Sequence, residues 1–108
     1  MDNFEATILI SSETPKNDIE KISENFENLI KNNDGTLIGK EDWGLRDLAY
    51  KINTLHKAFY FFYQINIEGS KIQNLKKSIS QNEKIIRFLF IKIKDHEKLP
   101  TKMLKGDE

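Results

Sequence analysis

The chain has 108 residues, of which 38% are hydrophobic, and its formal net charge at pH 7 is zero. This length suits a single domain with one core and is too short for a deep enclosed active site with a separate cofactor domain. The chain has no cysteine, which excludes a disulfide framework and thiolate metal or redox chemistry. No apolar run approaches the roughly 20 residues of a membrane span, and the first ten residues lack the basic start of a secretory signal. We therefore expect a cytoplasmic protein without membrane contact.

The charges are unevenly distributed along the chain. Residues 1–35 hold eight acidic and three basic side chains, a net charge of −5, so the remaining 73 residues hold +5. A neutral protein can present a basic surface when its acids gather on another face. The alternative interpretation is that both signs are scattered over the whole surface as solvated charges.

The first 35 residues predict a strand followed by a helix. Apolar residues at positions 4, 6, 8 and 10 alternate with their neighbours, which is the period of a half-buried strand. Thr14 and Pro15 form the N-cap and N1 pair that begins a helix. Apolar residues then repeat at helical spacing as far as Ile30. We expect this helix to end near residues 33–35, where Gly35 can take a left-handed conformation, and its acidic face to point to solvent.

The middle of the chain predicts two strands joined by a loop. Residues 36–50 form the first strand, with Gly39 and Gly44 at bulges or bends, and residues 51–58 form the loop. Residues 59–67 are rich in aromatic and β-branched types, which favours a strand. By alternation, its odd-numbered residues face the helices and its even-numbered residues face the other way.

A second helix and a fourth strand follow. Ser70 and Gln73 have the spacing of a capping box, and the apolar stripe after them predicts a helix over residues 70–81. Residues 85–94 predict a strand whose even-numbered residues face the helices. We expect residues 1–94 to form the domain. Residues 95–108 show no hydrophobic period, and we expect a flexible tail there that is mobile or orders only on a partner.

This β-α-β-β-α-β order predicts an α+β protein with a ferredoxin-like fold, in which two helices cover one face of a four-stranded antiparallel sheet. The other face of the sheet is left bare. Tyr60, Phe62, Leu89 and Ile91 are expected there, and such an apolar patch indicates a protein partner at least as readily as stacked bases. If the alternation is misassigned, these residues belong to the core instead.

Catalytic and metal-binding patterns are weak. His56 and His96 are the only histidines, and without metal-ligand spacing they are expected to be solvated surface residues. Ser11, Ser12 and Thr14 are interpreted as turn and capping residues, since no nucleophile motif surrounds them. We predict a protein that is not an enzyme and that has no metal, no cofactor and no small-molecule substrate.

Residues 41–50, EDWGLRDLAY, hold the only tryptophan and the first of two arginines. Together with DGTLIGKED before them, FYFFYQINI after them and IIRFLFIKI further on, they resemble the bacterial small-subunit ribosomal protein S-six (S6) family over residues 3–94. Asp47 stands where that family usually has a second basic residue, and Lys51 replaces its proline. The signature residues that match are Trp43, Gly44, Arg46, Leu48, Ala49, Tyr50 and Ile52.

The resemblance implies a non-catalytic role in the ribosome. It implies binding to 16S rRNA in the central domain of the small subunit, as a heterodimer with ribosomal protein S-eighteen (S18). Arg46 and Tyr50 are candidate RNA contacts by their match to the signature. Lys51, Arg87 and Lys92 are added from charge and position.

Two further expectations concern the bare sheet face. A basic partner docked there would cover Phe62, Leu89 and Ile91, so Phe62→Asp is predicted to prevent pairing. The alternative function is a stand-alone dimerising ferredoxin-like domain, which uses the same face to bind itself or a small ligand.

Overall fold

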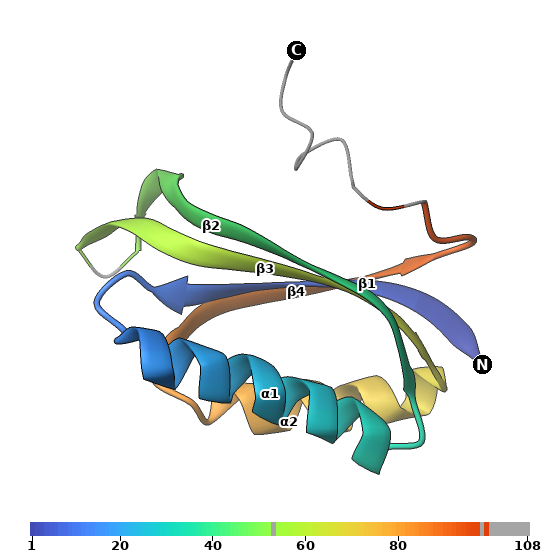
Figure 1. The fold of residues 1–108 in the computed structure, drawn as a ribbon. Helices are drawn as coiled ribbons and strands as arrows, with labels where there is room; N and C mark the ends of the chain where they lie inside the picture. Colours follow the sequence, from blue (N-terminus) through green and yellow to red (C-terminus); the bar gives the residue numbers. More distant parts are fainter. Residues whose placement is uncertain (53, 98, 100–108) are drawn as a thin grey trace.

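A computed structural model describes residues 1–52, 54–97 and 99. Four strands form one antiparallel sheet in the order β2-β3-β1-β4, and two α-helices cover one of its faces (Figure 1). This α+β arrangement is the predicted one. The sheet face away from the helices is called the open face below. The elements are β1 (Asp2–Ser11), α1 (Lys16–Asn32), β2 (Thr36–Ile52), β3 (Leu55–Ile67), the 3-10 helix η1 (Gly69–Lys71), α2 (Ile72–Ser80) and β4 (Ile85–Ile93).

The core lies between the helices and the helix-facing side of the sheet. The alternation predicted for β1 is confirmed, since Phe4, Ala6, Ile8 and Ile10 are at most 8% exposed. Burying each large apolar side chain contributes about 1.5–3 kcal/mol, which explains why one-sided patterning is enough to fix the layers. The other core residues are Ile22, Phe26 and Ile30 of α1, Phe61, Tyr63, Ile65 and Ile67 of β3, and Ile72, Leu75 and Ile79 in α2.

β4 departs from strict alternation at its start. Phe88 and Phe90 pack against the core as predicted, but Ile85 does so in place of Ile86. The reason is a register shift between Leu9 and Ile10 of β1, after which Ile10 pairs with Ile85. The bulge turns the first residue of β4 toward the helices.

The beginning and the end of α1 differ from the prediction. Pro15 is the N-cap residue and no side chain caps the helix. The predicted cap Thr14 is 7% exposed, and its Oγ1 has no hydrogen-bond partner within the described residues. At the other end Asp34, with φ of 62°, takes the left-handed conformation expected for Gly35. Gly35 is required for space, because a Cβ there would lie 2.9 Å from Cγ2 of Ile30 and 3.0 Å from Cδ1 of Ile67.

The second helical segment begins without the predicted capping box. Ser70 lies within η1, and α2 starts at Ile72 after Lys71, with no side-chain hydrogen bond at either helix start. The apolar stripe of Ile72, Leu75 and Ile79 is buried as expected. Packing of this stripe, and not capping, therefore holds α2 on the sheet.

β2 and β3 form a long hairpin that continues through the predicted loop. β3 begins at Leu55, so residues 55–58 are strand and not loop, and β2 extends to Ile52. Register shifts occur between Leu37 and Gly39, between Asp42 and Gly44, and between Asp47 and Ile52. The first two confirm the glycine bulges. At the third, residues 48–51 of β2 lie opposite His56 alone, so the end of the hairpin is strongly bent.

Residues 94–97 and 99, here called the C-terminal segment, cross the open face. Asn3 Nδ2 donates to the Lys94 carbonyl oxygen at 2.9 Å, and Gln64 Nε2 donates to that of Glu97 at 2.8 Å. Nε2 of His96 lies 3.1 Å from the Ile65 carbonyl oxygen. His96 is thus half-buried and not the solvated residue predicted. The domain boundary at residue 94 and the flexibility of the tail stay predictions, and residues 98 and 100–108 lie outside the described part of the chain.

Candidate nucleic-acid and partner interface

Trp43 covers part of the open face. Its ring stacks on Phe62 with centroids 5.1 Å apart and planes 11° from parallel, and its Nε1 donates to Oε1 of Glu41 at 2.8 Å. Trp43 reaches Phe62 from the bulge between Asp42 and Gly44, where Gly44 has φ of 73°. Phe62 is consequently 4% exposed, and the expectation that it forms an open patch is wrong.

The C-terminal segment covers the next part of the same face. Gln64 is only 2% exposed and holds the Glu97 carbonyl. Gly39 lies against it on β2, where a Cβ would meet Leu99 Cδ1 at 2.6 Å. The β2 and β3 side of the open face is therefore closed within the chain over Phe62 and Gln64.

The β4 side of the open face remains accessible. Leu89 is 56% exposed and Ile91 is 46% exposed, as the alternation predicted, and Tyr60 is half-buried. Large apolar side chains exposed next to each other on one strand mark an interaction surface more often than chance. Of the four predicted partner residues, the structure leaves Leu89, Ile91 and part of Tyr60 available for contact.

Two predicted RNA-contacting residues meet at the bent end of the hairpin. Arg87 Nη1 donates to the Tyr50 hydroxyl at 3.0 Å, and the guanidinium carbon lies 5.7 Å from the centre of the Tyr50 ring. β2 and β4 are opposite edges of the sheet, so this contact requires the hairpin end to curl over the open face. Tyr50 is 64% exposed, so most of its surface remains accessible although Arg87 lies over the ring.

Three further basic groups lie on β2 and β3 near the hairpin end. Lys51 is exposed, and Lys57 is 3.7 Å from the carboxylate of Asp47. Arg46 is half-buried, and its Nε donates to the Trp43 carbonyl oxygen at 3.0 Å. This hydrogen bond turns part of the guanidinium toward its own strand.

Lys92 lies apart from this group. It pairs with Phe4, a core residue, so its backbone position belongs to the helix-facing side of β4. Its ammonium is 3.5 Å from the carboxylate of Asp2, the first residue of β1. The structure thus gathers Arg46, Tyr50, Lys51 and Arg87 at one end of the molecule and excludes Lys92 from that cluster.

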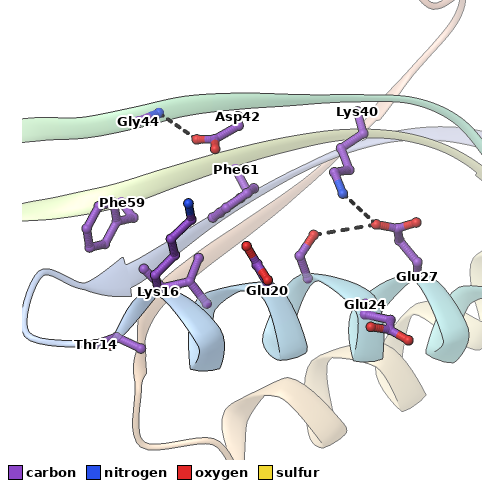
Figure 2. A pocket seen from close by; sticks show the side chains of 12 residues that line it. Thr14, Lys16, Glu20, Glu24, Glu27, Lys40, Asp42, Gly44, Phe59 and Phe61 are labelled. Carbon is purple, nitrogen blue, oxygen red and sulfur yellow. Dashed lines mark hydrogen bonds and ion pairs between the residues drawn. The ribbon is translucent and has the colours of Figure 1, made fainter.

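The sequence analysis missed a groove on the helix-facing side, here called the α1 groove (Figure 2). It has a volume of about 700 Å³ and lies between α1 and the β2–β3 hairpin. The acids of α1 were interpreted as a solvated face, and Glu20 and Glu24 are indeed exposed. Their spacing with Glu27 also places them on one side of the helix, the side that lines this groove. On β2, Asp42 and Lys40 pair with the core residues Phe61 and Tyr63, so they lie on the side of the sheet that faces these acids. The alternation of residues along β2 was the sequence signal for this arrangement.

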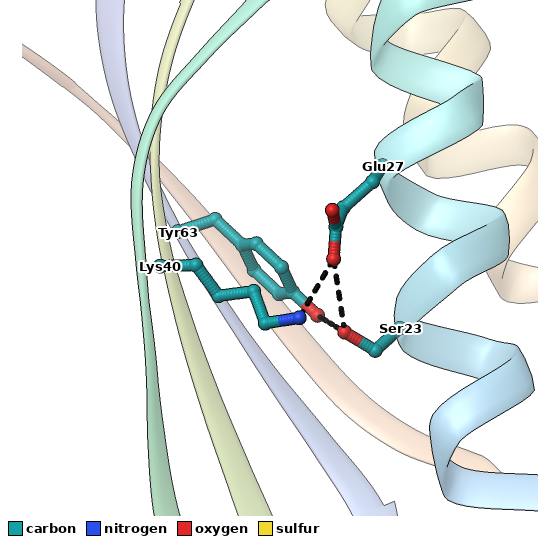
Figure 3. Close-up of polar contacts among 4 residues, drawn as sticks. All are labelled: Ser23, Glu27, Lys40 and Tyr63. Atoms are coloured by element: carbon teal, nitrogen blue, oxygen red, sulfur yellow. Dashed lines mark hydrogen bonds and ion pairs between the residues drawn. The ribbon is translucent and has the colours of Figure 1, made fainter.

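One end of the α1 groove is tied by polar contacts between α1 and the sheet (Figure 3). Lys40 Nζ is 2.7 Å from Glu27 Oε2, and the Ser23 and Tyr63 hydroxyls are 2.9 Å apart. Burial raises the pKa of Tyr63 well above its ordinary value, although the Ser23 hydrogen bond acts in the opposite direction. The phenol is therefore neutral at physiological pH and serves as a structural hydrogen-bonding group.

Within the described residues, no group of three or more His, Asp or Glu side chains could hold a metal ion. None of the helices in residues 1–52, 54–97 and 99 has the length and apolar character needed to cross a bilayer. His56 is exposed on β3, and His96 binds the backbone of β3 instead of another ligating side chain.

Comparison with known proteins points to one family. The family model described as Ribosomal protein S6 matches residues 3–92. The small ribosomal subunit protein bS6 of Rickettsia felis is 41% identical over 106 residues, which covers 98% of this chain and 88% of that protein. The corresponding protein of Rickettsia prowazekii is 42% identical with the same coverage. A crystal structure of 30S ribosomal protein S6 from Thermotoga maritima shares the fold, with a TM-score of 0.82 at 22% identity over 85% of this chain and 87% of that one.

Proposed function

Because the chain belongs to the ribosomal protein S6 family, we propose that it binds 16S rRNA in the central domain of the small subunit as a heterodimer with ribosomal protein S18. The family consists of ribosomal proteins and not of enzymes. In this role the chain is a structural component of the ribosome in the cytoplasm.

The observation that carries RNA binding is the cluster at the hairpin end. Tyr50, Lys51 and Arg87 are exposed there, and Arg46 lies close to them on β2. The acidic residues of α1 lie on the other side of the sheet. A flat exposed ring beside guanidinium and ammonium groups suits an RNA loop, in which bases stack and phosphates pair with cations.

The number of cations limits what the chain can do alone. Each phosphate neutralised contributes about 0.7 to 0.9 to the slope of log K against log salt. Three or four available cations therefore support weak, strongly salt-dependent binding. A basic partner on Leu89 and Ile91 would add phosphate contacts beside Arg87 on the same strand, so tight binding is assigned to the pair.

An RNA titration tests this proposal. A fragment of the 16S rRNA central domain is titrated at fixed salt with the chain alone, with S18 alone and with the mixture. Only the mixture is expected to bind tightly. Tight, specific binding by the chain alone would contradict the role given to the partner, and no binding by the mixture would contradict RNA binding itself.

The variant that tests the partner surface is Leu89→Asp. Phe62→Asp, the variant that the sequence suggests, is unsuitable because Phe62 is buried under Trp43 and a carboxylate there would destabilise the fold. Leu89 is exposed, so aspartate there leaves the fold intact and places a carboxylate in the interface. Ile38→Asp, at a 51% exposed position on the opposite edge strand, is the matched control. Equal effects of both variants on pairing would refute this placement of the partner.

The exposure of Leu89 and Ile91 also suits a second candidate function, a stand-alone domain that dimerises through these residues. Sedimentation equilibrium of the isolated chain distinguishes the two. A dimer that Leu89→Asp dissociates, together with no RNA binding by the mixture with S18, would favour the second function.

A further inference from the structure

The α1 groove has an apolar floor. Phe59 and Phe61 of β3 and Ile19 of α1 line it (Figure 2). Phe61 is 5% exposed, whereas Phe59 and Ile19 are half-buried and present part of their surface to the groove. An aliphatic or aromatic side chain placed on this floor would remove apolar surface from water on both partners.

The rim of the groove is anionic. Glu20, Glu24 and Glu27 of α1 and Asp42 of β2 line it, against Lys16 and Lys40, so the lining has a formal net charge of −2. Glu27 is paired with Lys40, and Asp42 Oδ1 accepts a hydrogen bond from the Gly44 amide at 2.8 Å. Within the described part of the chain, Glu20 and Glu24 make no ion pair or hydrogen bond. Two carboxylates are thus available beside the apolar floor.

The Lys16 side chain lines the same groove. Figure 2 shows it directed from α1 toward the strand that carries Phe59 and Phe61. Its aliphatic stem suits the aromatic floor and its ammonium suits the acidic rim. At the same end of the groove, Thr14 is 7% exposed and its Oγ1 lacks a hydrogen-bond partner within the described residues.

We propose that the α1 groove docks a segment of a protein partner in which an arginine or lysine adjoins a large apolar side chain. The apolar side chain lies on Phe59 and Ile19, and the cation pairs with Glu20 and Glu24. This inference goes beyond the proposed rRNA and S18 contacts, since the groove lies on the opposite side of the sheet from both. The net negative charge of the lining disfavours a polyanion such as RNA.

The groove is built in advance of binding. The Lys40–Glu27 pair and the Ser23–Tyr63 hydrogen bond fix the distance between α1 and the hairpin at one end. Little conformational entropy is then lost from the chain when a segment docks. Proteins that bind RNA are rich in Lys and Arg. A segment of such a protein would carry the positive charge that this groove accepts.

The test uses the isolated full chain and a small probe, acetyl-leucyl-arginine amide. Amide chemical shifts are followed by NMR, and the control probe is acetyl-leucyl-citrulline amide, which has nearly the same shape and no charge. Saturable shifts confined to residues lining the groove are expected, with a dissociation constant of roughly 1 mM. Citrulline is expected to bind about two- to fivefold more weakly, the range of a surface ion pair.

Paired substitutions separate a specific site from a general charge effect. Lys16→Gln should tighten arginine binding and Glu24→Gln should weaken it. Lys21→Gln, on α1 outside the groove, and Glu83→Gln, in the loop before β4, make the same changes in net charge and should have no effect. Equal binding of the two probes, equal effects of variants and controls, or the absence of saturable shifts up to roughly tenfold above the expected constant would each overturn the proposal. None of these outcomes depends on RNA binding.

Discussion

Replacing Trp43 by phenylalanine tests whether the family's tryptophan stabilises the hairpin through its indole nitrogen. Phenylalanine keeps an aromatic ring to stack on Phe62 but removes the hydrogen bond to Glu41. Glu41 is 6% exposed, so its carboxylate cannot replace the lost donor with bulk water at no cost. The variant therefore isolates one contact between two residues of the signature region.

The expected loss follows from the type of bond. Hydrogen bonds to charged groups contribute about 1.5–3 kcal/mol to the free energy of unfolding. Glu41 has a further interaction, and Trp43 is half-buried, so we expect the lower part of that range. For a domain of this size, each kcal/mol lowers Tm by about 4–8 °C.

Urea denaturation followed by far-UV circular dichroism is the suitable assay, because the substitution removes the only tryptophan fluorophore. The same substitution in a Glu41→Gln background gives the coupling energy between the two side chains. A neutral acceptor makes a weaker bond, so the loss should be smaller there. A loss below about 0.5 kcal/mol, or an equal loss in both backgrounds, would refute the role of the hydrogen bond.

Three other substitutions test single features. Thr14→Val should raise the free energy of unfolding by about 1 kcal/mol, since it removes a buried hydroxyl without a partner in the described chain; a lower urea midpoint would mean that the hydroxyl is hydrogen-bonded. Gly39→Ala should speed amide exchange at residues 96, 97 and 99 more than it lowers global stability, because its Cβ would lie 2.6 Å from Cδ1 of Leu99 and 2.8 Å from Oε1 of Gln64, which holds that segment; unchanged exchange would contradict the docking of that segment. Arg46→Ala should lower the salt slope of RNA binding by about 1, whereas parallel losses of thermal stability and RNA affinity would mark Arg46 as structural.

Patterning predicted the layers because burial is one-sided. The alternation in β1 and the stripe of α2 have one buried face each, and the structure follows them residue by residue. The hairpin end was misassigned because residues 55–58, LHKA, carry weak strand propensity. Their strand conformation comes from pairing with β2, in which Leu55 pairs with Ile52 and Lys57 with Asp47.

The covered part of the open face could not be predicted from one strand at a time. Alternation correctly put Phe62 and Gln64 on that face, but their burial depends on side chains from elsewhere in the chain. Trp43 reaches Phe62 across a bulge, and Gln64 holds the backbone of Glu97, which is 33 positions away. Lys92 is a different case. The alternation that places Phe88 and Phe90 toward the helices places Lys92 on the same side, so the sequence alone could have excluded it from the open face.

The zero net charge of the chain conceals two surfaces of different charge on opposite sides of the sheet. At the hairpin end, Arg87 and Tyr50 hold each other in an exposed position that suits RNA. On the helix side, the acids of α1 face β2 across an apolar floor and would repel RNA. Physiological salt screens exposed charges beyond about 8 Å, and the sheet lies between the two surfaces. If both proposals hold, a nucleic acid on one side of the sheet and a basic protein on the other would bind the same neutral domain without competing for one surface.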